Sequence, residues 1–250
     1  MQLCKIFTCP ALPQDLAGKR TPTYISLGCQ CLPAMIFKEL NLRFDSYPFD
    51  WVLSSPAFVY EMLRLLLDED LNVDQLVRSH FFRNDARCWY DDHEHYKITP
   101  NGRAVCNSRY DVVFPHDRHN EENISKYKRR FLRLKERLLD TSTPLRFVWI
   151  SQSSLTKGNF TLDGKEVVTD VFENLNKICA LLSKYHSNFD MLVYDAVQNE
   201  RPAHLNSRII VSKISPAPYF MRMKKEVKDK IVNSYLPQTS SVPHPITGPP

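Results

Sequence analysis

Short apolar segments alternate with long amphipathic ones along most of this chain, and no other feature constrains its fold as strongly. The apolar segments have the length of strands and lie at 24–28, 110–115, 145–151, 190–195 and 208–214. The amphipathic segments show helical periodicity and lie at about 31–40, 56–68, 121–139, 170–185 and 221–235. Strands separated by helices of this length predict βαβ units. We therefore expect an α/β fold, with a mostly parallel sheet flanked by helices.

Three segments depart from this alternation. We expect residues 1–22 to form a loose leader. We expect the proline-rich residues 237–250 to form a flexible tail, because proline neither continues a helix nor fits a central strand. Between them, residues 23–236 predict a single α/β domain. An insertion at about 80–109 carries an Asn-Gly pair at 101–102, which is a strong hairpin turn signal. We expect its flanks to form a small β-ribbon.

Composition excludes several classes of protein. Of the 250 residues, 43% are hydrophobic and 24% charged, and the longest uncharged apolar runs are far too short to span a bilayer. The N-terminal residues lack an apolar signal region. The seven cysteines are an odd number and do not have the spacing of a secreted disulfide framework, which favours reduced thiols. We expect a cytoplasmic protein without a membrane partner.

The positive charge is mild and concentrated. The net charge is +5, and the densest basic run, at 126–137, lies on the amphipathic helix expected at 121–139. Its apolar stripe faces the core, so the cations are most simply a solvated helix face, with binding of phosphate or an acidic surface as the alternative. No aromatic interleaving supports base stacking. We expect no nucleic-acid partner.

Cys31 occupies a position that favours a reactive thiol. The strand expected at 24–28 turns at Gly28 and leads into the helix at about 31–40, so that Cys31 lies at the helix N-terminus. Unpaired N–H groups and the helix dipole favour thiolate over thiol there. From this placement we expect the pKa of Cys31 to lie below its ordinary value.

Polar residues follow the predicted strands at the edge where parallel sheets gather their sites. His116 and Asp117 follow one strand, and Asp195 ends another with Asn199 just beyond. A nucleophilic thiol needs an imidazole to take its proton and a third group to orient that imidazole. We therefore predict Cys31 as nucleophile, His116 as general base, and Asp195 or Asn199 as the orienting group.

Three blocks of the sequence carry a resemblance to a known family. They contain Ser26, Leu27, Gly28, Cys31 and Ala34, then Leu42, Arg43 and Ser46 to Trp51, and finally Phe114, His116 and Asp117. In this order they resemble a family of papain-like cysteine peptidases over roughly residues 23–215. The resemblance implies a thiol-dependent hydrolase that acts on protein or peptide-like substrates without a cofactor. A papain fold is α+β with an antiparallel half, and this is the alternative to the α/β fold that the pattern predicts.

The second block suggests supporting roles near the site. Asp50 is expected to brace an aromatic loop by accepting backbone N–H bonds, while Trp51 walls the pocket. The alternative is a direct role in the site, in which they orient His116 or bind substrate. Arg43 has two candidate partners, the Asp50 carboxylate or an anionic substrate.

Residues beside the predicted dyad leave further alternatives open. Gln30 is a candidate to lend its backbone amide to an oxyanion hole. Cys29 is an additional thiol two residues before Cys31, which opens the alternatives of redox chemistry or a different active thiol. Asp117 is a candidate cap for the helix at 121–139, for which Asn120 competes.

Two other functions remain alternatives at this level. A metal-assisted hydrolase is suggested by a second cluster, which comprises Cys88, Asp91, Asp92, His93, His95, Cys106, His116, Asp117 and His119. Two histidines one residue apart on a strand share a face, as zinc sites often need, but the spacing matches no standard zinc pattern. The other alternative is a non-enzymatic protein-binding module on the same fold.

Overall fold

The computed structural model of the chain describes residues 21–28, 31–85, 104–110, 112–151, 159–162, 165–168, 170–196, 201–215 and 220–235. Most of the expected leader, most of the expected β-ribbon with its Asn-Gly turn, and the tail at 237–250 lie outside the described residues.

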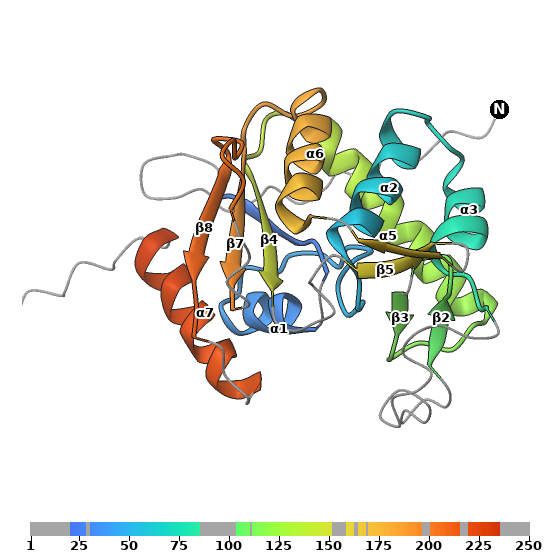
Figure 1. The fold of residues 1–250 in the computed structure, drawn as a ribbon. Coiled ribbons are helices and arrows are strands. Elements are labelled where there is room, and N and C mark those ends of the chain that lie inside the picture. The colour runs from blue at the N-terminus through green and yellow to red at the C-terminus, as the bar shows by residue number, and fades with distance from the viewer. Residues whose placement is uncertain are drawn as a thin grey trace, which may run out of the picture.

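A parallel sheet forms the centre of the described chain (Figure 1). Its strands run in the order β1 (Thr23–Ser26), β4 (Leu145–Ser151), β7 (Phe189–Asp195) and β8 (Ile209–Lys213). Every neighbouring pair in this sheet is parallel. The two central strands are buried almost throughout, as expected where helices cover both faces. The predicted α/β fold is therefore confirmed.

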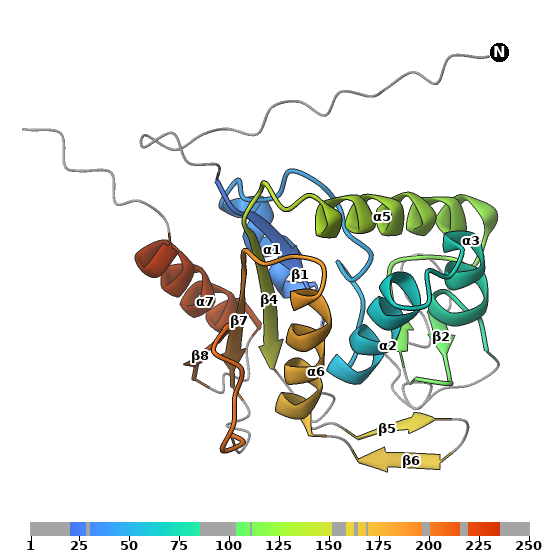
Figure 2. The same ribbon diagram turned by 90° about the horizontal axis from the view of Figure 1, so that it is seen from above.

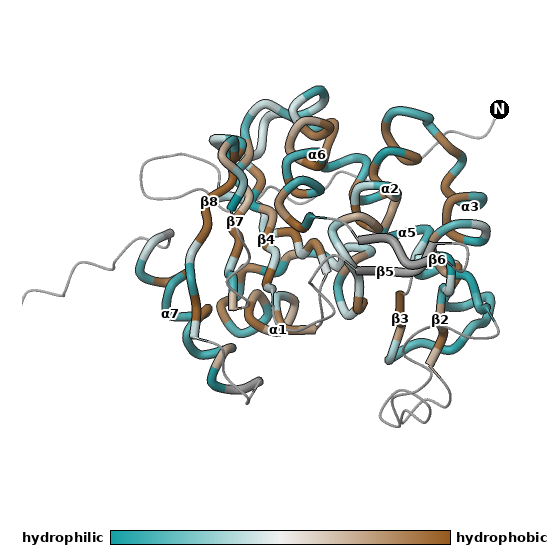
Figure 3. Tube along the Cα trace, in the orientation of Figure 1, coloured by the Kyte–Doolittle hydropathy of each residue, from teal (hydrophilic) through white to brown (hydrophobic). Residues whose placement is uncertain are grey.

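Helices cover both faces of the sheet (Figure 2). α1 (Leu32–Glu39) and α7 (Phe220–Tyr235) pack on one face, whereas α6 (Val171–Ser183) and α2 (Pro56–Leu67) belong to the core on the other. Successive side chains of a strand point to opposite faces, so Trp149 joins the core beneath α6 while its neighbours on β4 join the core beneath α1 and α7. In Figure 3 the central strands are correspondingly brown. All four helices begin and end within about two residues of the expected positions.

A second lobe packs beside the sheet and is built around aromatic rings. It contains α2, α3 (Val73–Gln75), the π-helix η1 (Leu76–Phe81), β2 (Val105–Asn107), β3 (Val112–Phe114) and α5 (Glu121–Leu139). Phe81 lies at its centre, with ring centroids 4.8 to 5.6 Å from those of Phe58, Phe114, Tyr127 and Phe131. The residues at 73–81 were not predicted as helical.

The strand expected at 110–115 was predicted to join the parallel sheet, and this assignment is wrong. β3 instead pairs antiparallel with β2, and Val113 also forms an antiparallel bridge with Leu53. Only a short turn separates β2 from β3, and so short a connection permits only antiparallel pairing. One expected flank of the β-ribbon, at 103–106, thereby overlaps β2 and pairs with β3.

A further antiparallel pair, β5 (Asn159–Leu162) and β6 (Lys165–Val168), lies between β4 and α6 in the sequence. It was not predicted. Within the described ranges, no helix combines the length and apolar character needed to cross a membrane.

The long helix α5 has the predicted bounds, and Asn120 rather than Asp117 is its N-cap, accepting a 2.9 Å hydrogen bond from the Asn123 backbone N–H. Its basic run is not only a solvated face. In the described part of the chain, five of its cations pair with carboxylates outside the helix: Lys126 with Asp117, Lys128 with Asp74, Lys135 with Asp70, and both Arg133 and Arg137 with Asp45. These ion pairs tie α5 to three other segments of the chain.

Candidate active site

The turn that leads to the predicted nucleophile depends on a glycine. Gly28 follows β1 with φ of +92°, and its backbone N–H donates a 3.1 Å hydrogen bond to Ser26 Oγ. A Cβ at this position would lie under 3.0 Å from Ser54 Oγ. Glycine therefore permits both the left-handed backbone and the close approach of the segment that carries Ser54.

Cys31 is the N-cap residue of α1, as predicted, and is half-buried. Its Sγ lies 3.1 Å from Nε2 of His116, which is within hydrogen-bond reach for sulfur. The two residues are 85 positions apart in the sequence. His116 is exposed, so the pair is open to a molecule arriving from solvent.

His116 reaches Cys31 from the second lobe rather than from the parallel sheet. It follows β3, whose position is fixed by its pairing with β2 and by the bridge from Val113 to Leu53. The rings of Trp51 and His116 meet edge to face, with their centroids 5.8 Å apart and an interplanar angle of 88°. The site thus forms where the first helix of the α/β domain meets the antiparallel lobe.

The pKa of Cys31 is not lowered as its helix position led us to expect. Burial raises the pKa of the Cys31 thiol to about 11, against the opposing effect of its own backbone N–H. The Sγ makes no capping hydrogen bond to the helix, and Pro33 in the first turn has no N–H to offer. The loss of solvation therefore has a larger effect on the pKa than the helix N-terminus has. The thiol needs a proton acceptor close by if it is to act as a nucleophile.

The loop between α1 and α2 braces one wall of the site through a buried ion pair. Asp50 is 2% exposed and accepts hydrogen bonds from Arg43 Nη2 at 3.0 Å and from the Tyr47 backbone N–H at 3.1 Å. The Arg43 guanidinium also lies 5.7 Å from the Trp51 ring centroid. Trp51 has φ of 69°, a conformation that a bulky residue adopts only when its surroundings hold it there. The bracing interpretation of Asp50 thus fits these contacts, and Arg43 pairs with it.

The other candidate acids lie in different surroundings. Asp117 binds Lys126 and accepts a 2.6 Å hydrogen bond from Tyr127 Oη, both on α5. Asp195 is buried at the carboxyl end of β7, where it stands in register with Ser151 and Lys213. Its role as the orienting group stays a prediction. Cys29, Gln30 and Asn199 lie outside the described residues.

Comparison with known protein families gives one match. Residues 22–183 match the model of a family described as “Putative papain-like cysteine peptidase”. The chain belongs to this family. The match contains both Cys31 and His116 but ends before 195, so it covers less of the C-terminal half than the sequence resemblance suggested. Neither a curated protein nor a solved structure matches the chain.

The residues of the proposed metal cluster that the structure describes make other contacts. Among the described residues, no three His, Cys, Asp or Glu side chains form a group that could hold a metal ion. His116 lies against Cys31, Asp117 is bound to α5, and His119 Nε2 lies 3.1 Å from the Phe82 carbonyl oxygen. Cys106 is buried in the second lobe. The other proposed ligands, His93 and His95 among them, lie outside the described residues.

Two features near the candidate site were missed in the sequence. Tyr127 was assigned only to the apolar stripe of its helix, and its hydroxyl has no local pattern that points to Asp117. Ser54 was not singled out, yet it is 5% exposed and its hydroxyl has no hydrogen-bond partner in the described part of the chain. The Tyr127 contact depends on how the turn before α5 lies against the helix, and the approach of Ser54 to Gly28 joins two separate segments. No local sequence pattern encodes either contact.

Proposed function

We propose that the protein is a thiol-dependent hydrolase of protein or peptide-like substrates, with Cys31 as nucleophile and His116 as general base. The observation that carries this proposal is the 3.1 Å separation of Sγ and Nε2 at a half-buried thiol beside an exposed imidazole. Membership of a family described in terms of cysteine peptidase chemistry supports it.

The raised pKa of Cys31 defines what His116 has to do. With a pKa of about 11, Cys31 is a neutral thiol near pH 7. As Sγ forms a bond to the substrate carbonyl carbon, the S–H proton passes to Nε2 and the carbonyl electron pair moves onto its oxygen. The imidazolium and the oxyanion then replace two neutral groups, so that free thiolate never has to accumulate.

The same imidazole completes the cycle. When the tetrahedral intermediate collapses, the imidazolium donates its proton to the leaving amine and the acyl group stays on Sγ. Water then attacks this thioester while Nε2 takes one of its protons. Collapse of the second intermediate releases the carboxylic acid and returns a proton to Sγ, and the dyad is regenerated.

The oxyanion needs donors on the same side as Sγ. The backbone N–H of Cys31 opposes the effect of burial on the pKa of its thiol. Because this amide stands at the N-terminus of α1, we take it as the candidate oxyanion donor. We propose that the backbone amide of Gln30 also donates to the oxyanion.

The imidazole must also hold one orientation. For Nε2 to accept the thiol proton, Nδ1 has to carry the ring proton, and an acceptor at Nδ1 would fix that tautomer. The Trp51 edge contact limits rotation of the ring. Asp195 and Asn199 remain the proposed acceptors at Nδ1.

The test is alkylation of the folded protein by iodoacetamide, followed by peptide mass spectrometry at each cysteine. Cys31 should react fastest in the wild type, whereas Cys106 and Cys179, which are at most 4% exposed, serve as slow internal controls. His116→Ala should slow the reaction of Cys31 by about 100-fold at pH 7. In that variant the rate should keep rising with pH towards about 11, because only free thiolate is left to react.

Turnover of peptide substrates gives the second measurement. Cys31→Ala, His116→Ala and the double variant should lose similar amounts of activity, because groups that act as a unit are not additive. Equal alkylation rates in wild type and His116→Ala would refute the general-base role. Fast alkylation without any hydrolysis of a diverse peptide library would instead indicate a non-enzymatic module.

A further inference from the structure

A hollow whose lining holds more cations than anions is connected to the dyad through Arg43 and Trp51. It has a volume of about 470 Å³ and is lined by Lys38, Asn41, Arg43, Phe44, Asp45, Ser46 and Arg133. Three of these residues are cations and one is an anion. We propose that this hollow is a substrate subsite that binds an acidic segment of the peptide, a proposal that rests on the function proposed above.

The hollow carries charge that its own residues do not neutralise. Arg133 and Arg137 both approach Asp45, at 3.3 and 3.9 Å, and Arg137 also lies 3.7 Å from Asp140. Arg43 pairs with the buried Asp50. Lys38 is exposed and takes part in no ion pair within the described chain. The positive charge in excess at the hollow is therefore that of Lys38, which faces solvent and attracts an anionic ligand.

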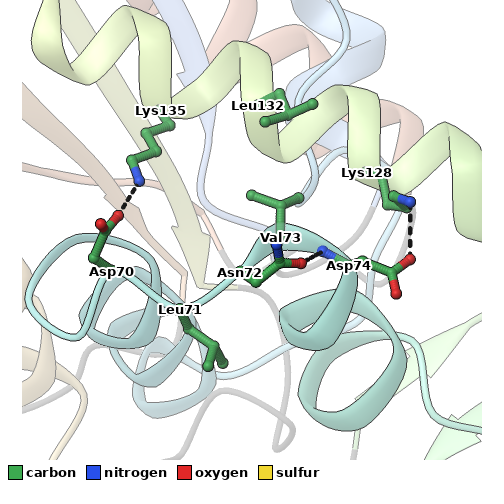
Figure 4. Close-up of a pocket in the computed structure, with 8 residues that line it drawn as sticks. All are labelled: Asp70, Leu71, Asn72, Val73, Asp74, Lys128, Leu132 and Lys135. Atoms are coloured by element: carbon green, nitrogen blue, oxygen red, sulfur yellow. Dashed lines mark hydrogen bonds and ion pairs between the residues drawn. The ribbon is translucent and has the colours of Figure 1, made fainter.

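A second hollow of similar size shows that such an excess is not general on this surface. It has a volume of about 510 Å³ and lies between α5 and the segment at 70–74 (Figure 4). Its two lysines, Lys128 and Lys135, are each paired with a carboxylate, Asp74 and Asp70. That hollow is matched in charge and does not call for an anionic ligand.

One aromatic side chain at the charged hollow is also open to solvent. The Phe44 side chain is 46% exposed, and an exposed ring beside cations offers an apolar contact to the backbone or side chains of a bound peptide. A peptide with acidic residues uses both features, whereas a free inorganic anion uses only the charge.

Contacts already described connect the hollow to the dyad. The Arg43 guanidinium lies 5.7 Å from the Trp51 ring, and the Trp51 ring lies 5.8 Å from that of His116. An extended peptide advances about 3.3 Å per residue. A peptide that runs from Cys31 past His116 and Trp51 towards Arg43 would place a side chain about three residues from the reacting bond at the hollow.

The experiment measures binding without depending on thiol chemistry. Two fluorescent peptides of the same sequence are compared on the Cys31→Ala protein by anisotropy, one with Asp and Glu and the other with Asn and Gln at the same positions. The acidic peptide should bind about five- to tenfold more tightly at low salt. Raising the ionic strength to about 0.5 M should remove most of the difference, because exposed charges are screened.

Two matched variants assign the effect to the hollow. Lys38→Glu should abolish the preference for the acidic peptide, whereas Lys225→Glu should leave it intact, since Lys225 is also an exposed helical lysine without an ion pair in the described chain. Both variants are surface substitutions whose folding is checked by thermal melting. Equal affinities for the two peptides, or a preference that survives Lys38→Glu, would overturn the proposal.

A final measurement links the hollow to the reaction. In the wild type, the acidic peptide should slow alkylation of Cys31 by iodoacetamide, while inorganic phosphate at the same concentration should not. Binding of the acidic peptide that leaves the alkylation rate unchanged, or equal protection by phosphate, would refute a peptide subsite. If Cys31 is alkylated as proposed but the two peptides bind equally, the subsite is refuted and the proposed function is not. If the acidic peptide binds more tightly but His116→Ala leaves the reactivity of Cys31 unchanged, the proposed function is refuted and the charge-selective hollow is not.

Discussion

Gly28→Ala should destabilise the protein through two separable effects. At φ of +92° any side chain is strained, at a cost of about 1–2 kcal/mol for a left-handed backbone. The new Cβ would also lie under 3.0 Å from Ser54 Oγ, while Ser54 Cβ at 3.5 Å and the Val52 carbonyl at 3.7 Å are at ordinary contact distance. Overpacking of this kind costs about 1–3 kcal/mol. The total loss in the free energy of unfolding is about 2–5 kcal/mol.

A double-mutant cycle with Ser54→Ala separates the two effects. The Ser54 hydroxyl is buried without a hydrogen-bond partner in the described chain, so its removal alone should be close to neutral. In the Ser54→Ala background the overlap disappears but the backbone strain remains. Gly28→Ala should then cost only about 1–2 kcal/mol, which leaves a coupling energy of about 1–3 kcal/mol between the two sites.

Urea unfolding followed by circular dichroism measures all four proteins, with the slope of the transition checked for constancy. If Gly28→Ala loses the same stability in both backgrounds, the overlap with Ser54 is not the cause and the reasoning fails. The same four proteins report on the site, because Gly28 sets the path from β1 to Cys31. Alkylation of Cys31 should slow in Gly28→Ala and recover in the double variant.

Two further predictions concern the groups that hold the site. Burial raises the pKa of Asp50, opposed chiefly by Arg43, so the folded chain holds this proton more tightly than the unfolded one. The stability contributed at Asp50 should be greatest below about pH 4 and fall as pH rises through the folded pKa. Asp50→Asn should therefore flatten this part of the pH profile of the free energy of unfolding. Parallel profiles for wild type and Asp50→Asn would contradict the prediction. Tyr127→Phe removes the hydroxyl that donates to Asp117 at 2.6 Å and should cost about 1–3 kcal/mol in urea unfolding, whereas an unchanged midpoint would show that the bond adds nothing to stability.

Much of the architecture could be predicted because it depends on local patterns. α5 has the predicted bounds since its apolar stripe has helical periodicity and Asn120 provides a cap at its start. The apolar runs of β4 and β7 predicted buried parallel strands for the same reason, because a strand covered on both faces needs apolar side chains in succession. Cys31 and His116 were singled out by residue type and by their place after strands.

What the sequence left undetermined depends on which distant segments meet. β3 has the composition of a sheet strand, but its partners are β2 and Leu53, and this pairing brings His116 to Cys31 from a separate lobe. The pKa of Cys31 was expected to fall with the helix terminus, a local effect, and instead rises because tertiary packing removes solvent from the sulfur. The sequence by itself determined the helices α1, α2, α5, α6 and α7, the central strands and the candidate dyad. The tertiary structure decided the pairing of β3, the desolvation of Cys31 and the charge environment of the site, because each of these depends on which separate segments pack together.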